Sequence, residues 1–316
     1  MAAYLPYAID VVGGRSVVRW IERGDASANW PFFRQMLRER LASGAAQRVT
    51  PLDTLLTERG PDPAGLVMHL SRCGSTLLMQ SLAHAGCIAP ISEAAPVNQL
   101  LARVDIPEPE RAGLLRGLIR ALGAQGGESR DLPSLVKFTS WNVLFIDILR
   151  AAFAGTPWLF LYRQPLEAMA SHEARPAGWL TDEQFLATLT QVHRLPSLAG
   201  LDREARCAAV LAAYGEAALD ASPAPDNLLN YSQLPAALLA DVPGRFGVPT
   251  SAAQQGQIVD ASRIYSKDAS RRLIFDPESE RRARRVTDRL REVDRQFTQP
   301  VHAALERCRL GPAAQR

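Results

Sequence analysis

The residues best suited to bind an anion lie in the segment "LVMHLSRCGSTLLMQSL", residues 66–82. An apolar run is followed by a small polar cluster, "SRCGST", and then by apolar residues at helical spacing. This order predicts a buried strand, a tight loop and the N-terminus of a helix. Backbone N–H groups and the helix dipole meet at such a junction, so it favours a phosphate-like anion. Backbone amides of residues 74–77 could wrap that anion, and Arg72 could add positive charge.

A second segment, "LYRQPLEAMAS", adds another pair of anion-binding side chains. Arg163 lies where a predicted strand ends, and Ser171 follows eight residues later within the next helix. Alone, each residue would be unremarkable on a protein surface. Beside the first loop, the two together could clamp a second phosphate.

Apolar strands that alternate with helices must position these residues. Four core strands are predicted at residues 66–70 and in "SLVKFT", "TPWLFLYR" and "DNLLNYS", with a short extended piece ending near Ser92-Glu93. Helices between the strands predict an α/β fold with three layers, a parallel sheet flanked by helices on both faces. Ligands of such sheets bind beyond the carboxyl ends of the strands. We therefore expect "SRCGST", the turn at Ser140, "YRQP" and "NYSQLP" to converge along one edge.

The remaining segments predict a leader and further helices. Residues 1–64 are expected to form a leader that packs on the core, with a hairpin turning at Gly13-Gly14 and a helix in "WPFFRQMLRERLAS". Residues 65–316 form the α/β domain. Helices are expected at 109–123, 141–153, 182–195, 203–219, 233–241 and 277–308.

Composition narrows the class of protein. The chain has 316 residues, 47% of them hydrophobic, and a net charge of only +3, which disfavours a nucleic-acid binder. Its four cysteines, at positions 73, 87, 207 and 308, show no zinc-ligand spacing and fit reduced thiols. The N-terminus lacks the basic region of a signal peptide, and the most apolar window contains charges and a proline. We expect a cytoplasmic protein without a membrane span, and its oligomeric state stays open.

The two anion-binding segments together resemble the sulfotransferases that use 3′-phosphoadenosine 5′-phosphosulfate (PAPS). In that family, a strand–loop–helix with a basic residue, a small residue, Gly and two hydroxyl residues holds the 5′-phosphosulfate, as "RCGST" would here. An Arg at a strand end, with Pro two and Ser eight residues later, binds the 3′-phosphate, as Arg163, Pro165 and Ser171 would. The chain departs from the family at Cys73, where Ser is usual, and at Arg72, where many members have Lys. The resemblance covers roughly residues 65–300 and implies a P-loop sulfotransferase-like fold.

The resemblance also implies a set of nucleotide-binding residues. "NYSQLP" weakly echoes a third family motif, and the late loop with Lys267 is the place of a basic lid over the 3′-phosphate, although a plain exposed lysine is an alternative. The implied cofactor-binding residues are Arg72, Cys73, Gly74, Ser75, Thr76, Leu77, Arg163, Ser171, Tyr231 and Lys267. PAPS would be the donor, 3′,5′-adenosine bisphosphate the product, and no metal is implied.

The implied catalytic residues are Arg72, Glu93 and Lys137. Arg72 suits the leaving phosphate, and Lys137 matches a family lysine that points at the transferring group. Thr139 occupies the position of the histidine base in the small-molecule branch, so the base is expected to be Glu93, 21 residues after Arg72 as in the protein-tyrosine branch. Alternatives are that Glu93 caps the following helix, or that His172 or His69 is the base.

The leading hypothesis is sulfuryl transfer from PAPS to a hydroxyl, or an amine, of a small-molecule or natural-product acceptor. The leader and the helices within 94–123 and 176–219 would shape the acceptor pocket. One alternative is a P-loop kinase or other phosphotransferase, although the chain lacks the Gly-Lys-Ser/Thr loop. Another is a catalytically inactive nucleotide-binding module of the same fold.

Overall fold

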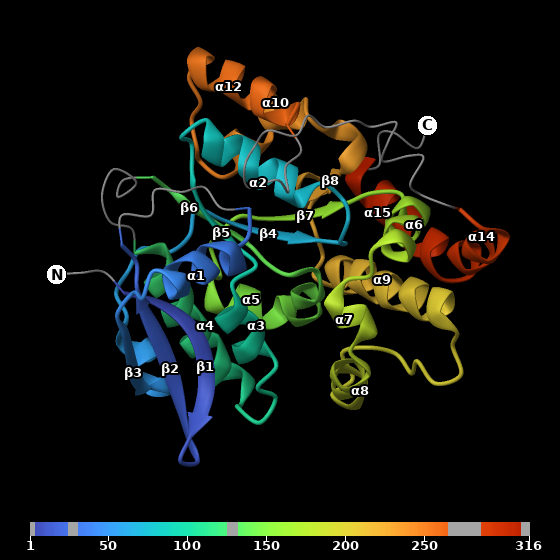
Figure 1. The fold of residues 1–316 in the computed structure, drawn as a ribbon. Helices are drawn as coiled ribbons and strands as arrows, with labels where there is room; N and C mark the ends of the chain where they lie inside the picture. The colour runs from blue at the N-terminus through green and yellow to red at the C-terminus, as the bar shows by residue number, and fades with distance from the viewer. Residues whose placement is uncertain (1–3, 25–30, 125–131, 265–285, 311–316) are drawn as a thin grey trace.

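The fold is built on a five-stranded sheet in which every pairing is parallel. A computed structural model describes residues 4–24, 31–124, 132–264 and 286–310 (Figure 1). The strand order is β5-β6-β4-β7-β8. The strands are β4 (Gly65–His69), β5 (Ala89–Ser92), β6 (Ser134–Lys137), β7 (Trp158–Tyr162) and β8 (Leu228–Asn230). Side chains of β4, β6 and β7 are buried throughout, as expected of strands covered on both faces.

Helices cover both faces of this sheet, which confirms the predicted three-layer α/β fold. Figure 1 shows α2 (Ser75–His84), α10 (Ala237–Ala240) and α12 (Ala252–Ser262) on one side, and α4 (Glu108–Gly123), α5 (Ile146–Ala152) and α9 (Arg203–Asp220) on the other. Further helices are α3 (Ala95–Leu101), α6 (Pro165–Ala174), α7 (Gly178–Thr181), α8 (Glu183–Gln191), α11 (Val242–Arg245), α14 (Asp288–Val293) and α15 (Gln299–Leu310).

The leader forms its own antiparallel sheet and packs on the core. Strands β1 (Tyr4–Val12) and β2 (Arg15–Glu22) form the predicted hairpin, with Gly13 and Gly14 both at positive φ. Strand β3 (Gln47–Pro51), which the sequence interpretation missed, pairs with β2, and α1 (Phe33–Ala42) lies between them in the chain. The following 3₁₀ turn (Leu52–Thr57) approaches α4 so closely that a Cβ on Gly117 would lie 1.8 Å from the Leu55 carbonyl oxygen. One continuous hydrophobic core therefore joins leader and sheet.

Four predicted helices differ from those observed, and the one predicted at 182–195 ends at Gln191. The predicted helix 233–241 begins only at Ala237, because Leu234 precedes Pro235 and is extended. The predicted helix after β6 begins as a 3₁₀ turn, Ser140–Phe145, before α5. The closing helix, predicted as continuous over 277–308, begins at Asp288 with Thr287 as its cap; residues 277–285 lie outside the described part. It also contains a π segment, Asp294–Thr298, just before Pro300, whose ring nitrogen has no proton to donate.

The C-terminal helix is anchored to the sheet through one carboxylate. Glu306 of α15 accepts hydrogen bonds from the Tyr162 hydroxyl (2.5 Å), from Asn230 Nδ2 (2.8 Å) and from Arg309 Nη2 (2.6 Å). Burial raises the pKa of the Glu306 carboxyl, but the hydrogen bonds from Arg309, Tyr162 and Asn230 outweigh it and lower the pKa to about 2. Because Tyr162 and Asn230 end β7 and β8, this carboxylate ties two strand ends to the closing helix.

We predict that Glu306→Gln lowers the free energy of unfolding at pH 7 by about 1–3 kcal/mol, since the amide keeps the shape but loses the charge. The pKa of this carboxyl is near 4.3 in an unfolded chain. The stabilisation by the ionised form is therefore full above that pH and disappears as the pH falls towards 2. Urea unfolding of both proteins at several pH values measures this, and a difference that is independent of pH would contradict the assignment.

Candidate active site

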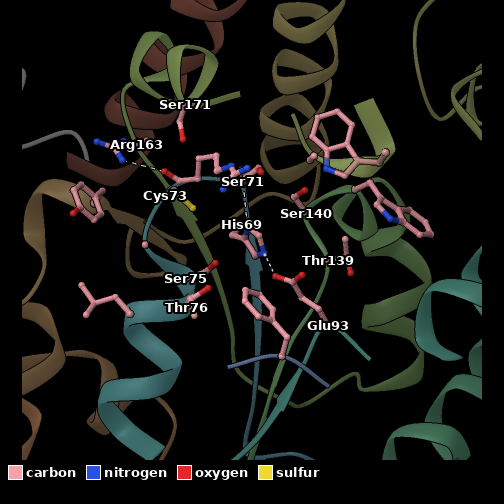
Figure 2. A pocket seen from close by; sticks show the side chains of 18 of the residues that line it. His69, Ser71, Cys73, Ser75, Thr76, Glu93, Thr139, Ser140, Arg163 and Ser171 are labelled. Carbon is pink, nitrogen blue, oxygen red and sulfur yellow. Dashed lines mark hydrogen bonds and ion pairs between the residues drawn. The ribbon is translucent and has the colours of Figure 1, made fainter. Parts of the chain in front are cut away.

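A pocket of about 750 Å³ lies at the carboxyl edge of the parallel sheet, where the sequence predicts the ligand site (Figure 2). Its walls come from the ends of several strands and from the leader. The lining residues that the sequence interpretation named for the site are Arg72, Cys73, Gly74, Ser75, Thr76, Leu77, Glu93, Arg163, Ser171 and Tyr231. Lys137 lies directly behind this wall, and Lys267 falls outside the described residues. The charged side chains in the lining are three arginines and one glutamate.

The loop after β4 presents backbone amides to the pocket. Ser71, Arg72 and Gly74 have positive φ values of 84°, 52° and 88°, so the chain turns sharply before α2 begins at Ser75. Gly74 is the N-cap and supplies no side-chain cap to the first turn. The first N–H groups of α2 thus have no intrahelical acceptors and point towards the pocket, an arrangement suited to an anion.

Arg163 joins the two predicted anion-binding segments. Its Nη1 donates to the Arg72 carbonyl oxygen at 3.0 Å, and its guanidinium lies 4.4 Å from the ring centroid of Tyr231. A salt bridge to Glu167, one turn along α6, fixes its other end. Arg163 is only 6% exposed, so its charge is held at the pocket wall and little screened by water. Arg72 itself is oriented by a hydrogen bond from Nη2 to the Arg175 carbonyl oxygen at 2.5 Å.

Cys73 contributes to the pocket through its backbone, since its side chain turns into the core. The Sγ atom lies 3.1 Å from the Leu161 carbonyl oxygen of β7, in hydrogen-bonding geometry, and the residue is fully buried. Burial raises the pKa of the Cys73 thiol to about 11, so the thiol is neutral at physiological pH. A neutral, buried thiol is a poor nucleophile, so only the backbone of Cys73 is available to a ligand in the pocket.

Glu93 and Lys137 form an ion pair at the centre of the site. Lys137 Nζ lies 2.6 Å from Glu93 Oε1 and donates to Thr76 Oγ1 at 3.1 Å, and the Phe32 ring covers it at 4.8 Å. The Lys137 side chain is 1% exposed, whereas that of Glu93 is 26% exposed and lines the pocket. Glu93 does not cap α3, whose N-cap is Ala94 without a side-chain cap. Glu93 has a positive φ of 52° and its carboxylate lines the pocket instead.

His69 also lies beside this carboxylate and approaches the same oxygen, Glu93 Oε1 (Figure 2). The Ser71 N–H donates to His69 Nδ1 at 3.1 Å, so the proton of the neutral ring lies on Nε2, 3.8 Å from Glu93 Oε1. In this tautomer neither nitrogen offers a free lone pair to the pocket, which disfavours His69 as the base. His172 is fully buried in edge contact with Trp179, at 5.4 Å between ring centroids, and is not part of the lining.

Several lining residues were not named individually from the sequence. They include Phe32 and Arg34 of the leader, Ala95 and Asn98 of α3, Trp141, Pro176 to Trp179, and Ser262 and Ile264. Those of the leader, α3 and residues 176–179 belong to the segments expected to shape an acceptor pocket, whereas Trp141, Ser262 and Ile264 do not, and no motif marks any of them. Tertiary packing decides which face of α1 or α3 lies against the sheet edge, so the sequence alone does not identify these residues.

Among residues 4–24, 31–124, 132–264 and 286–310, no group of three or more His, Cys, Asp and Glu side chains is placed to hold a metal ion. Within the same ranges, no helix is both long and apolar enough to cross a membrane.

We predict an asymmetry between the two partners of the central ion pair. Glu93→Gln leaves the Lys137 ammonium buried without its counter-charge and should cost about 2–3 kcal/mol of unfolding free energy. Lys137→Met keeps the packed stem and leaves a carboxylate that water can reach, so it should cost about 1 kcal/mol or less. Urea unfolding of both variants and the double variant tests this, and equal costs would show that the charge of Lys137 is not truly buried.

Comparisons with known proteins give little sequence evidence. No model of a protein family matches the chain, and no curated protein matches it. Among solved structures, the chain is similar to one described as "Sulfotransferase Domain from the Curacin Biosynthetic Pathway", with 14% identity and a TM-score of 0.41, over 75% of this chain and 98% of that one. At that identity and TM-score, the likeness is too weak to carry functional weight.

Proposed function

We propose that the protein transfers a sulfuryl group from PAPS to a hydroxyl, or an amine, of a small-molecule acceptor. The observation that carries the proposal is the contact between two anion-binding segments far apart in sequence. Arg163, at the end of β7, donates directly to the backbone of Arg72 in the loop after β4, and both line one pocket. A donor with a phosphate at each end of its ribose needs two such segments side by side.

The residues fit a nucleotide with two anionic groups. The uncapped first turn of α2 and Arg72 would hold the 5′-phosphosulfate, because amides and guanidinium converge there. Arg163 and Ser171 would hold the 3′-phosphate, with Arg163 oriented in advance by Glu167 and Tyr231. PAPS supplies the activated sulfuryl group, and the chain supplies position and charge.

Glu93 is suited to take the proton of the acceptor. Its carboxylate lines the pocket and forms an ion pair with Lys137. Lys137 in turn donates a hydrogen bond to Thr76 in the first turn of α2. As the acceptor oxygen bonds to sulfur, its proton passes to Glu93 and the bond from sulfur to the 5′-phosphate oxygen breaks. Arg72 and the amides of α2 would stabilise the charge left on that phosphate.

We predict that the protein binds 3′,5′-adenosine bisphosphate with micromolar affinity, and ATP and AMP far more weakly. Arg163→Ala should reduce the affinity for the bisphosphate at least tenfold, since a buried charge-assisted contact is lost. Calorimetric titration measures both. Arg245→Ala is a matched control, because Arg245 is also largely buried and paired with an acid but lies outside the pocket lining.

Ser171→Ala is a milder second variant, in case the Arg163 substitution disturbs the loop that it supports. It should weaken the bisphosphate several-fold and leave the fold unchanged. Absence of bisphosphate binding by the wild-type protein, or preferred binding of ATP with Mg²⁺, would overturn the proposal and favour a phosphotransferase.

A separate prediction concerns turnover. Glu93→Gln should lower the rate of sulfuryl transfer by about 10²–10⁴-fold while changing the affinity for 3′,5′-adenosine bisphosphate by less than threefold. Release of the bisphosphate from PAPS in the presence of an acceptor, assayed below the unfolding range of the variant, measures the rate. Unchanged turnover would show that another group accepts the proton, and binding without any turnover by the wild type would indicate an inactive nucleotide-binding module.

A further inference from the structure

The leader contributes one side chain to the centre of the site. Phe32 is the N-cap residue of α1, and the centroid of its ring lies 4.8 Å from Lys137 Nζ, within the range of a cation–π contact. The two oxygen atoms beside the same ammonium, Glu93 Oε1 and Thr76 Oγ1, belong to the α/β domain. A residue of the leader thus completes the surroundings of a charge that lies in the α/β domain.

Phe32 covers Lys137 on the side of the pocket. Phe32, Thr76 and Glu93 line the pocket, whereas Lys137 lies behind them with 1% of its side chain exposed. Removal of water from an ammonium costs free energy, and a buried ion pair is weak evidence for a gain in stability. The burial of Lys137 beside a pocket therefore indicates a role in the geometry of the site.

The backbone of Phe32 is held in place by its neighbours in the chain. The Phe32 N–H donates to Gln35 Oε1 at 3.2 Å, and the Phe32 carbonyl oxygen accepts the Gln35 N–H at 3.0 Å. The next residue, Phe33, is buried in the hydrophobic core. These contacts fix the start of α1, so the Phe32 ring is kept beside Lys137.

We propose that Phe32 is a positioning residue of the active site and that it acts through Lys137. Its ring keeps water from the ammonium, which strengthens the contacts of that ammonium with Glu93 and Thr76, because they then lie in a medium of low dielectric constant. Glu93 is thereby held in one position relative to the first turn of α2. The importance of that position for transfer rests on the proposed function, whereas the cover over Lys137 does not.

Chemical labelling of amines tests the cover without a substrate. The chain has two lysines, Lys137 and Lys267, so mass mapping of peptides identifies labelled Lys137 directly. An N-hydroxysuccinimide ester should label Lys137 of the folded wild type at least about 100-fold more slowly than in the urea-unfolded chain. Phe32→Ala should raise the rate in the folded protein at least about tenfold, and Phe32→Tyr, which keeps the ring, should restore slow labelling.

Leu37→Ala is the matched control. Leu37 lies on α1 and packs against the core, but it is not part of the pocket lining. Its truncation loosens the leader without removing the ring, so the labelling rate of Lys137 should stay within about threefold of the wild-type rate. Phe32→Leu replaces Phe32→Ala should the latter not fold, and it should also label faster than the wild type. Fast labelling of the folded wild type, no increase in either Phe32 variant, or an equal increase in Leu37→Ala would overturn the proposal.

Turnover tests whether the position of Glu93 depends on the ring. With PAPS as donor and phenol as acceptor, Phe32→Ala should lower kcat at least about tenfold, because Glu93 loses its alignment. The affinity for 3′,5′-adenosine bisphosphate should change by less than about threefold, and Phe32→Tyr should recover at least about half of the wild-type kcat. An increase in KM for phenol with unchanged kcat would assign the ring to acceptor binding and overturn the positioning role. Binding of the bisphosphate without turnover by the wild type would overturn it as well.

Failure of the proposed function gives a different pattern. If the wild type does not bind 3′,5′-adenosine bisphosphate, sulfuryl transfer is wrong, and the labelling rates still decide whether Phe32 covers Lys137. If the wild type binds the bisphosphate but Lys137 is labelled rapidly in the folded protein, the role of Phe32 is wrong and the proposed function stands.

Discussion

The salt bridge between Lys137 and Glu93 is the interaction around which the site is organised. A lysine with 1% of its side chain exposed needs a counter-charge, and Glu93 on the neighbouring strand end supplies it at 2.6 Å. The pair joins the ends of β5 and β6, and Thr76 extends it to the first turn of α2. The sheet edge, the proposed proton acceptor Glu93 and the first turn of α2 are therefore fixed relative to one another by one buried ammonium.

Backbone conformations around this pair are unusual and are held in place by neighbouring groups. Ser71, Arg72 and Glu93 have positive φ values, which non-glycine residues adopt only when the surroundings enforce them. Arg163 secures the Arg72 carbonyl, and the Lys137 carbonyl secures the Glu93 N–H. The strain lies where the loops present amides and a carboxylate to the pocket, which is the usual place for it in a functional site.

The sequence was sufficient to predict the sheet and the charged centre of the site. Buried strands alternating with helices can only form a covered parallel sheet, and the carboxyl ends of its strands bring Arg72, Glu93, Lys137 and Arg163 to one edge. Local patterns could not predict β3, since four of the five residues in Gln47–Pro51 are exposed and only pairing with β2 makes them a strand. Nor could periodicity show that residues 286–287 are not helical and that the Thr287 side chain caps the helix that begins at Asp288.

The same distinction separates the two ends of the pocket. Under the proposed function the pocket has a nucleotide end and an acceptor end. The nucleotide end is built from loops that directly follow strands, so its residues are fixed by chain order and by the sheet. The acceptor end is built from Phe32 before α1, Asn98 on α3 and Trp179 on α7, whose positions depend on how those segments pack against the sheet edge. Residues at this end can change without disturbing the sheet or the anion-binding loops. Under the proposed function, such a pocket can keep its donor site while the segments that would contact the acceptor change.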